Sequence, residues 1–277
     1  MPVTDTAVPS AAQLLDLAVE AATAAGKMLR ASSAAGPTTV GAKSSRTDLV
    51  SDLDRASEEL IVEHIRAHRP HDSFLGEEGG AAGGAARVRW VIDPLDGTVN
   101  FLYGLPVWAV SVAAEVDGRT VAGVVHHPPG GETFTAALGG GARCNGRQLR
   151  VGSADELALA LVATGFAYAA STRVRQAEAL PVLLGSVRDI RRAGAAALDL
   201  CWVAAGRVDA YFETGTHVWD RAAGALIAEE AGAWVGGLDG GPASDAMVVA
   251  ANPGLAGRLR RLLLEAGAGW VLAAEEP

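Results

Sequence analysis

Cysteine is nearly absent from this sequence: only Cys144 and Cys201 occur among its 277 residues, and they form no Cys-x-x-Cys pair. With so little thiol chemistry, we expect a reduced, cytoplasmic protein. No run of about eighteen apolar residues occurs either, so we expect no membrane span and no membrane partner. The first residues include Asp5 and lack a basic cluster, so they do not resemble a signal peptide.

Basic residues are also scarce. Lysine and arginine number 23 against 32 aspartates and glutamates, which gives a net charge of −9. This balance disfavours broad nucleic-acid binding, which needs a basic surface, so we expect no nucleic-acid partner. The chain also lacks an internal repeat and a Gly-x-Ser-x-Gly segment, and the second absence disfavours a hydrolase with a Ser-His-Asp triad.

Two amphipathic helices are expected in the first third of the chain. Helical spacing of apolar residues over 11–31 follows Ser10, a candidate N-cap. A second helix is expected over 52–68, where Ser51 and Asp54 form a capping-box pattern with aspartate in place of glutamate. Its expected apolar side comprises Leu53, Ala56, Leu60, Ile61 and Ile65.

Residues 107–151 predict an antiparallel meander that packs on these helices. Its strands are expected at 107–116, 120–126 and 132–137, with hairpin turns at Asp117-Gly118 and Asn145-Gly146. Residues 33–42 predict a loop or irregular strand. The Gly- and Ala-rich residues 79–86 fit equally a mobile flap beside a site or a surface insertion.

Strands and helices alternate after residue 152, which is typical of an α/β unit. Strands are expected at 157–164, 187–190, 208–212 and 247–251, and helices at 173–184, 195–205, 218–231 and 254–266. The sequence therefore predicts an α+β protein. Its expected domains are an N-terminal α+β domain at 1–151 and a smaller C-terminal α/β domain at 152–277.

The stretch 88–101 carries the strongest chemical signal. A short buried strand is expected over 88–92, and Asp93 and Asp96 follow it, separated by Pro94. Gly97 and Thr98 could open a helix whose free N–H groups bind an anion. Carboxylates beside an anion site imply a cation between them, Mg²⁺ first and Mn²⁺ second. An Asp-x-x-Asp-Gly segment alone fits an ordinary β-turn equally well.

Other acidic residues have simple structural explanations when each is taken alone. Asp54 suits the dipole of the helix it begins, and Asp220 can cap the helix expected from 218. Glu77 and Glu213 lie at strand ends, where glutamates are commonly solvated. Taken one at a time, none of these four carboxylates indicates a functional site.

Asp93-Pro94-Leu95-Asp96-Gly97-Thr98-Val99-Asn100-Phe101 resembles the first signature of the inositol monophosphatase family of Mg²⁺-dependent phosphatases. Further blocks match that family in the same order: 43–54, 76–78, 191–200 and 219–230. The resemblance extends from Lys43 to about Val235 and is greatest to the bacterial inositol-1-monophosphatases. It implies a layered α/β/α/β/α sandwich, with an antiparallel N-terminal sheet.

The resemblance also assigns roles to individual residues. It implies two or three Mg²⁺ ions, with Mn²⁺ as a substitute, held by Glu77, Asp93, Asp96, Asp220 and the main-chain carbonyl of Leu95. Catalysis by direct attack of water, without a covalent phosphoenzyme, is implied for Thr98, Asp54 and Glu77. Phosphate contacts are implied for Lys43, Gly97 and Thr98, and ring contacts for Gly194, Ala195, Ala196, Glu213 and Asp220.

One departure from the family pattern concerns specificity. Ala195 stands where many members carry Thr or Ser, so a hydroxyl contact to the substrate is lost. The implied reaction is hydrolysis of a small phosphate monoester, inositol monophosphate first, in a lithium-sensitive homodimer. Fructose 1,6-bisphosphate, histidinol phosphate and adenosine 3′,5′-bisphosphate are alternative substrates, because relatives of this fold share the metal site. A non-catalytic regulator of RNA or the transcription machinery is the alternative of a different class.

Overall fold

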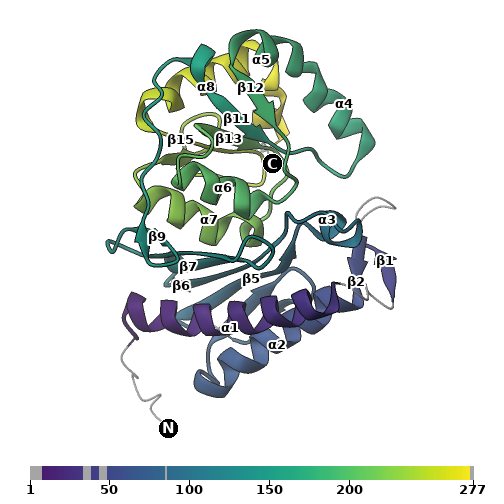
Figure 1. Cartoon of the computed structure of the whole chain (residues 1–277), viewed down its shortest axis with the longest axis vertical. Coiled ribbons are helices and arrows are strands. Elements are labelled where there is room, and N and C mark those ends of the chain that lie inside the picture. The colour runs from purple at the N-terminus through teal and green to yellow at the C-terminus, as the bar shows by residue number, and fades with distance from the viewer. Residues whose placement is uncertain (1–7, 34–38, 44–48, 85, 275–277) are drawn as a thin grey trace.

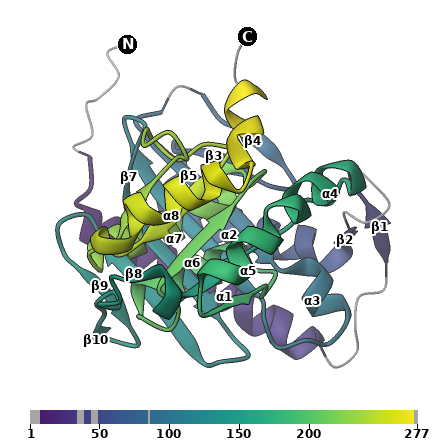
Figure 2. The ribbon, with the colours of Figure 1, turned by 90° about the horizontal axis from the view of Figure 1, so that it is seen from above.

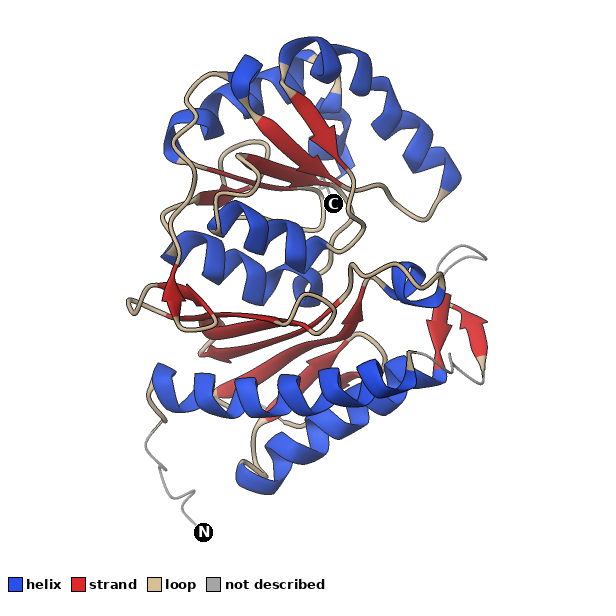
Figure 3. Cartoon of the chain, in the orientation of Figure 1, coloured by secondary structure: helices blue, strands red, loops and turns tan. Residues whose placement is uncertain are grey.

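The chain forms five alternating layers of helices and sheets (Figures 1 and 3). A computed structural model describes residues 8–33, 39–43, 49–84 and 86–274. The first layer contains α1 (Ala11–Ser32) and α2 (Asp52–His68), and an eight-stranded sheet lies on it. The middle layer contains α6 (Ala196–Ala204) and α7 (Val218–Glu230). A five-stranded sheet follows, covered by α4 (Ala170–Glu178), α5 (Leu180–Ser186) and α8 (Pro253–Glu265). The predicted α/β/α/β/α sandwich is confirmed.

The larger sheet has the strand order β10-β9-β8-β7-β6-β5-β3-β4. Its strands are β3 (Ser73–Gly76), β4 (Gly80–Ala82), β5 (Val88–Asp96), β6 (Ala109–Val116), β7 (Arg119–His127), β8 (Glu132–Ala137), β9 (Ala142–Cys144) and β10 (Arg147–Gln148). All neighbours are antiparallel except β3 and β5, which run parallel. The predicted meander is confirmed, and Asp117 and Asn145 adopt the positive φ that hairpin turns of this kind require.

Short strands occur within 79–86, which was expected to be a loop, and within 33–42, which was expected to be a loop or irregular strand. β4 lies within the predicted Gly/Ala loop at 79–86 and pairs with β3, while residue 85 is outside the described residues. β1 (Val40–Ala42) pairs with β2 (Leu49–Ser51) in a separate two-stranded ribbon. Parts of three further predictions also lie outside the described residues. They are residues 34–38 of the loop or irregular strand predicted at 33–42, residues 44–48 of the matching block at 43–54, and residues 1–7, where no signal peptide was expected.

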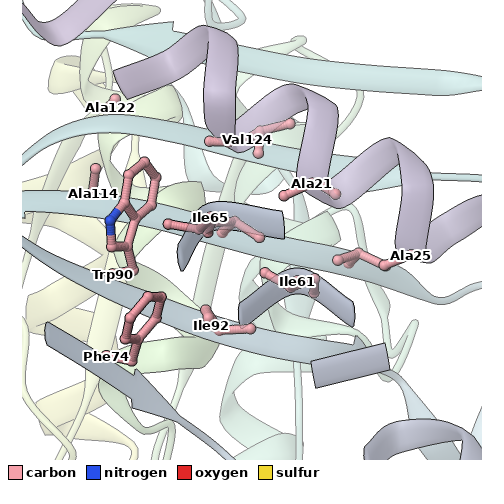
Figure 4. Close-up of a cluster of buried hydrophobic side chains, with 14 of the residues drawn as sticks. Ala21, Ala25, Ile61, Ile65, Phe74, Trp90, Ile92, Ala114, Ala122 and Val124 are labelled. Atoms are coloured by element: carbon pink, nitrogen blue, oxygen red, sulfur yellow. The ribbon is translucent and has the colours of Figure 1, made fainter. Parts of the chain in front are cut away.

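In the core between the first two layers, small residues of α1 pack with larger residues of α2 and of the sheet, such as Ile61 and Trp90 (Figure 4). Ala21 and Ala25 of α1 are completely buried, so the helix axis can lie close to the sheet. Trp90 on β5 is also completely buried, and its indole N–H donates to Asp72 Oδ2 at 2.9 Å. This bond satisfies the polar atom of the largest buried side chain, which would otherwise be destabilising.

The buried face of α2 differs from the predicted one. It comprises Asp54, Ser57, Glu58, Ile61 and Ile65, whereas Ala56 is exposed and Leu53 and Leu60 are only partly buried. The apolar pattern predicted this face incorrectly, because the first two turns of α2 pack against the carboxyl end of β5 through polar side chains. The predicted caps are confirmed, since Gln13 N donates to Ser10 Oγ and Ser51 N donates to Asp54.

Glycine and alanine allow α7 to pack closely on both of its neighbours. A Cβ atom at Gly123 of β7 would lie 2.9 Å from Cα of Ala223 on α7. On the other side, a Cβ atom at Gly224 would lie 2.9 Å from Cβ of Leu200 on α6. One hydrophobic cluster therefore joins β5 and β6 to α6 and α7, across the expected domain boundary. The division at residues 151/152 stays a prediction.

The smaller sheet has the order β12-β11-β13-β15-β14 and is parallel only over β12-β11-β13. Its strands are β11 (Leu161–Thr164), β12 (Asp189–Arg191), β13 (Ala210–Glu213), β14 (Trp234–Gly236) and β15 (Val248–Ala251). The predicted strand at 157–164 begins instead with a 3₁₀ turn, Leu157–Leu159. The predicted helix at 173–184 is two helices, because Pro181 begins a new first turn.

Two elements in this half were not predicted. β14 is only three residues long, and a 3₁₀ segment at Ala268–Ala274 closes the described chain. Among the helices of the described ranges, none has the length and apolarity needed to cross a bilayer. Figure 2 shows α8 lying across the outer side of the smaller sheet.

We predict opposite stability effects for the same substitution at two glycines. Gly123→Ala should lower the free energy of unfolding by about 1–3 kcal/mol, because the new methyl group would collide with the α7 backbone. Gly257→Ala should raise it by about 1 kcal/mol, because Gly257 is exposed within α8 and nothing lies within 4 Å of the place that its new methyl group would take. Thermal and urea unfolding of both variants measures this. Equal stabilities would contradict the close packing of β7 on α7.

Candidate active site

A cavity of about 340 Å³ opens where the carboxyl end of β5 meets the N-terminal ends of α6 and α7. It is lined by residues from both halves of the chain. Among them are nearly all those for which the sequence predicted a role: Lys43, Glu77, Asp93, Leu95, Asp96, Gly97, Thr98, Gly194, Ala195, Ala196, Glu213 and Asp220. Asp54 alone of the predicted set does not line the cavity; it is fully buried beneath it.

β5 does not end at residue 92 as predicted but continues to Asp96. Residues three apart in a regular strand point to opposite faces, so Asp93 and Asp96 could not both face one cavity. The pairing of β5 with β6 is irregular between these two residues, and such a bulge redirects side chains. Asp93 Oδ1 also accepts from the N–H of Leu95 at 3.0 Å, which holds its carboxylate locally.

Gly97 makes the turn from β5 into the short helix α3 (Thr98–Leu102). Its φ is 90°, and a Cβ atom there would lie 2.8 Å from the carbonyl oxygen of Val107. Only glycine fits such a position without strain. The predicted helix opening at Gly97 and Thr98 is therefore present, though the helix has only five residues.

Thr98 and Asp54 form a buried pair. The hydroxyl of Thr98 donates to Asp54 Oδ1 at 2.8 Å and lies 3.0 Å from the carbonyl of Leu95. Asp54 Oδ2 accepts from the backbone N–H of Ser51 at 2.9 Å, so Asp54 caps α2 and holds Thr98 with the same carboxylate. Because a hydroxyl has one hydrogen, donation to Asp54 leaves the lone pairs of Thr98 free to accept a hydrogen bond.

Asp96 joins the two halves of the chain. Its Oδ1 accepts from the N–H of Ala196 at 3.1 Å and its Oδ2 from the N–H of Ala197 at 2.8 Å. These N–H groups belong to the first turn of α6, which has no capping side chain of its own. Asn100 adds a second tie, since its Nδ2 donates to the carbonyl of Ala193 at 2.9 Å. A carboxylate at the positive end of a helix stabilises both partners.

Glu77 and its neighbours are held by a cation and by a buried glutamate. Lys43 Nζ lies 2.7 Å from Glu77 Oε1 and 2.5 Å from Glu78 Oε1. Glu58 of α2 accepts from the N–H groups of Glu78 and Gly79, at 2.9 and 2.7 Å. Burial is the largest single influence on the pKa of Lys43 and would lower it, but the charges and hydrogen bonds of Glu77 and Glu78 together outweigh burial and raise that pKa.

The carboxylates of the cavity raise one another's pKa values. Burial is the main cause of the raised pKa of Asp93, followed by the charges of Glu77 and Asp96. Burial likewise dominates at Asp96, and Asp220 adds to it. The pKa of Asp220 rises to about 6, chiefly through burial, although the N–H of His217 opposes this. Crowded carboxylates of this kind favour protons or metal cations as counter-ions.

The donor set suits a hard cation, because it offers carboxylate oxygens and the carbonyl of Leu95. Across the described ranges, no group of three or more His, Cys, Asp or Glu side chains is gathered tightly enough to hold an ion by itself. A cation here would therefore complete its coordination with water or a ligand.

Several supporting residues were not predicted from the sequence: Ser57, Glu58, Asn100, Asp199 and Tyr211. Ser57 Oγ donates to the carbonyl of Pro94 at 2.9 Å, and Tyr211 donates to Glu213. A usable signal existed for Ser57 and Glu58, because they lie three and four residues after Asp54 on one helix face. Asp199 was also detectable as a single carboxylate within the apolar run of α6.

Asp199 is 1% exposed, and neither carboxylate oxygen has a hydrogen-bond partner within the described residues. Burial raises its pKa well above the ordinary value, and the nearby charges of Glu213 and Asp96 raise it further. A neutral, protonated Asp199 is the form that this environment favours.

An acidic, oxygen-lined cavity with helix N-termini at its rim is typical of an enzyme that cleaves phosphate esters with the help of a bound cation. Comparison with known proteins agrees. The model of the inositol monophosphatase family matches residues 10–268. The chain therefore belongs to the inositol monophosphatase family, whose members are metal-dependent phosphatases.

Individual relatives cover most of the chain. The inositol-1-monophosphatase of Mycobacterium leprae is 50% identical over 237 residues, which are 82% of this chain and 81% of that protein. The Nus factor SuhB of Pasteurella multocida is 44% identical over 236 residues, 82% of this chain and 86% of that protein. The solved extragenic suppressor protein suhB of Bartonella henselae has a TM-score of 0.87 at 37% identity, covering 91% of this chain and 98% of that one.

We predict that Asp199 makes stability depend on pH. Because its folded pKa is raised above the unfolded value, its contribution is fully present below about pH 4 and is lost as pH rises through the folded pKa. Asn at this position cannot ionise. The melting temperature of Asp199→Asn minus that of the wild type should therefore increase from pH 5 to pH 8, by on the order of a few degrees.

Thermal unfolding at a series of pH values checks this prediction. Asp16→Asn is the matched control, because it makes the same substitution at an aspartate that is exposed on α1. A constant difference for Asp199→Asn across the same range would contradict a raised pKa at Asp199.

Proposed function

We propose that this protein is a Mg²⁺-dependent phosphomonoesterase that hydrolyses inositol monophosphates to myo-inositol and phosphate by direct attack of water. The observation that carries this proposal is that four carboxylates, Glu77, Asp93, Asp96 and Asp220, line one cavity together with the Thr98 hydroxyl that Asp54 orients. The 50% identity to proteins named inositol-1-monophosphatase supports the choice of substrate.

Glu77, Asp93, Asp96, Asp220 and the carbonyl of Leu95 would hold two or three Mg²⁺ ions. Mg²⁺ commonly keeps several waters and takes only one or two carboxylates from a protein, so four carboxylates around one cavity could serve more than one ion. When bound, Mg²⁺ makes water a stronger nucleophile and neutralises charge on the phosphoryl group. Mn²⁺ has similar ligand preferences and is expected to substitute.

The protein's own groups would orient the attacking water. Thr98 donates its only hydroxyl hydrogen to Asp54, so it can accept a hydrogen from water and aim a lone pair of that water at phosphorus. Glu77 lies on the same cavity and can accept the second hydrogen. The burial of Thr98 and Asp54 keeps this pair rigid.

Phosphate and ring contacts would come from different residues of the cavity lining. The N–H groups of Gly97 and Thr98 and the ammonium of Lys43 suit the phosphate. Ring contacts are proposed for Gly194, Ala195, Ala196, Glu213 and Asp220. The N–H of Ala196 already donates to Asp96, so its remaining contribution would be its methyl group. Ala195 offers no hydroxyl, so Glu213 becomes the main acceptor for ring hydroxyls.

A second role, with a regulatory partner, is favoured by the names of some relatives. Proteins 41–44% identical to this chain are named Nus factor SuhB. The net charge of −9 does not favour direct RNA binding. The complete carboxylate set and the Thr98–Asp54 pair favour catalysis over a purely regulatory role. A homodimer is proposed from the family resemblance, and light scattering would measure it.

We predict that Asp93→Asn abolishes Mg²⁺-dependent phosphate release, by on the order of a hundredfold or more, because a buried ligand charge is lost. Phosphate release from inositol 1-phosphate measures the effect, and circular dichroism checks that the fold survives. Asp16→Asn, an exposed aspartate on α1, should leave turnover unchanged. Turnover retained by a folded Asp93→Asn protein would contradict the metal assignment.

We also predict a substrate order. Inositol 1-phosphate should give the highest kcat/KM in a panel with fructose 1,6-bisphosphate, histidinol phosphate and adenosine 3′,5′-bisphosphate, and omission of Mg²⁺ should remove all activity. Millimolar Li⁺ should inhibit in the same assay. A different substrate at the top of the panel would overturn the inositol assignment and leave the phosphatase assignment intact.

A further inference from the structure

Glu213 is held against the cavity wall by a neighbour on its own strand. Tyr211 and Glu213 are two residues apart on β13, so their side chains leave the same face of the sheet. The hydroxyl of Tyr211 donates to Glu213 Oε2 at 2.8 Å. Within the described residues, no hydrogen bond reaches Oε1 of Glu213, and Glu213 lines the cavity while Tyr211 does not. The tyrosine therefore holds one carboxylate oxygen and leaves the other for a ligand.

Tyr211 itself cannot move easily. Its side chain is completely buried and belongs to a cluster with Leu200 and Val203 of α6. A tyrosine ring fixed by packing on a helix is a rigid anchor for its single hydroxyl. The carboxylate that accepts from this hydroxyl is consequently restricted before any ligand arrives.

A glycine provides the space that the carboxylate occupies. Gly165 directly follows β11, which pairs with β13. A Cβ atom at Gly165 would lie 1.9 Å from Oε2 and 2.1 Å from Oε1 of Glu213. The Glu213 carboxylate therefore lies directly over the α-carbon of Gly165. The three atoms nearest to that Cβ position all belong to the end of the Glu213 side chain, so an alanine there would displace this carboxylate first.

We propose that Tyr211 and Gly165 are positioning residues that fix Glu213 as a preorganised acceptor for the hydroxyl groups of a polyol phosphate. Tyr211 supplies the hydrogen bond, and Gly165 supplies the space. This inference rests on the proposed function and gives a reason for the enzyme's preference for inositol monophosphates. Substrates with free ring hydroxyls bind through Glu213, whereas simple phosphate monoesters do not use this residue. Preorganisation acts on affinity because the acceptor need not be ordered when the substrate binds.

The test compares two substrates, inositol 1-phosphate and p-nitrophenyl phosphate, which lacks hydroxyl groups. Tyr211→Phe should raise KM for inositol 1-phosphate about tenfold, the effect of losing one hydrogen bond that orients a charged acceptor. Its kcat for inositol 1-phosphate, and both constants for p-nitrophenyl phosphate, should stay within about twofold of the wild type. Gly165→Ala should produce the same split. Tyr103→Phe, the same change at an exposed tyrosine, should alter nothing.

A double-mutant cycle shows whether Tyr211 acts through Glu213. In a Glu213→Gln protein, which should itself raise KM for inositol 1-phosphate, adding Tyr211→Phe should cause little further change. Additive effects, or equal losses on both substrates, would overturn the positioning role. If the wild type hydrolyses inositol 1-phosphate no better than p-nitrophenyl phosphate and Glu213→Gln has no effect, the proposed function fails instead.

Discussion

Repulsion between buried carboxylates is the constraint on which this structure depends. Asp93 is 1% exposed and Asp96 is 8% exposed, and each raises the cost of ionising its neighbours. A folded protein tolerates such a cluster only if hydrogen bonds and counter-ions compensate for it. The surroundings supply both: backbone N–H groups reach Asp93, Asp96 and Asp220, and Lys43 pairs with Glu77.

The hydrogen bonds that compensate for this repulsion also hold the two halves of the chain together. Asp96 lies on the larger sheet, yet it occupies the N-terminus of α6, a helix that lacks a cap of its own. The site and the joint between the two sheets are therefore one feature. Small residues at Gly123 and Gly224 allow α7 to approach closely enough for Asp220 to reach the same cavity. A cation bound there would be held by both halves of the chain at once.

Periodicity and turn signals predicted most helices and the meander, and the family resemblance predicted the layers and a role for many of the residues that line the cavity. Neither predicted the contacts that orient those residues. The meander and the caps at Ser10 and Ser51 depend on neighbours within a few positions, so local rules suffice for them. The predicted end of β5 at residue 92 was wrong, because the bulge beyond that residue depends on how β5 pairs with β6. The prediction of the buried face of α2 was partly wrong, because polar residues of that helix pack against β5.

By itself, the sequence determined which chemical groups are available: carboxylates after a buried strand, a glycine turn, a threonine and helix starts rich in small residues. Tertiary structure alone decided that Asp96 caps α6, that Glu58 holds the turn after Glu77, and that Tyr211 orients Glu213 over Gly165. The physical reason is separation. The Asp96–Ala196 bond joins residues 100 positions apart, and no local propensity encodes a contact that only packing brings together.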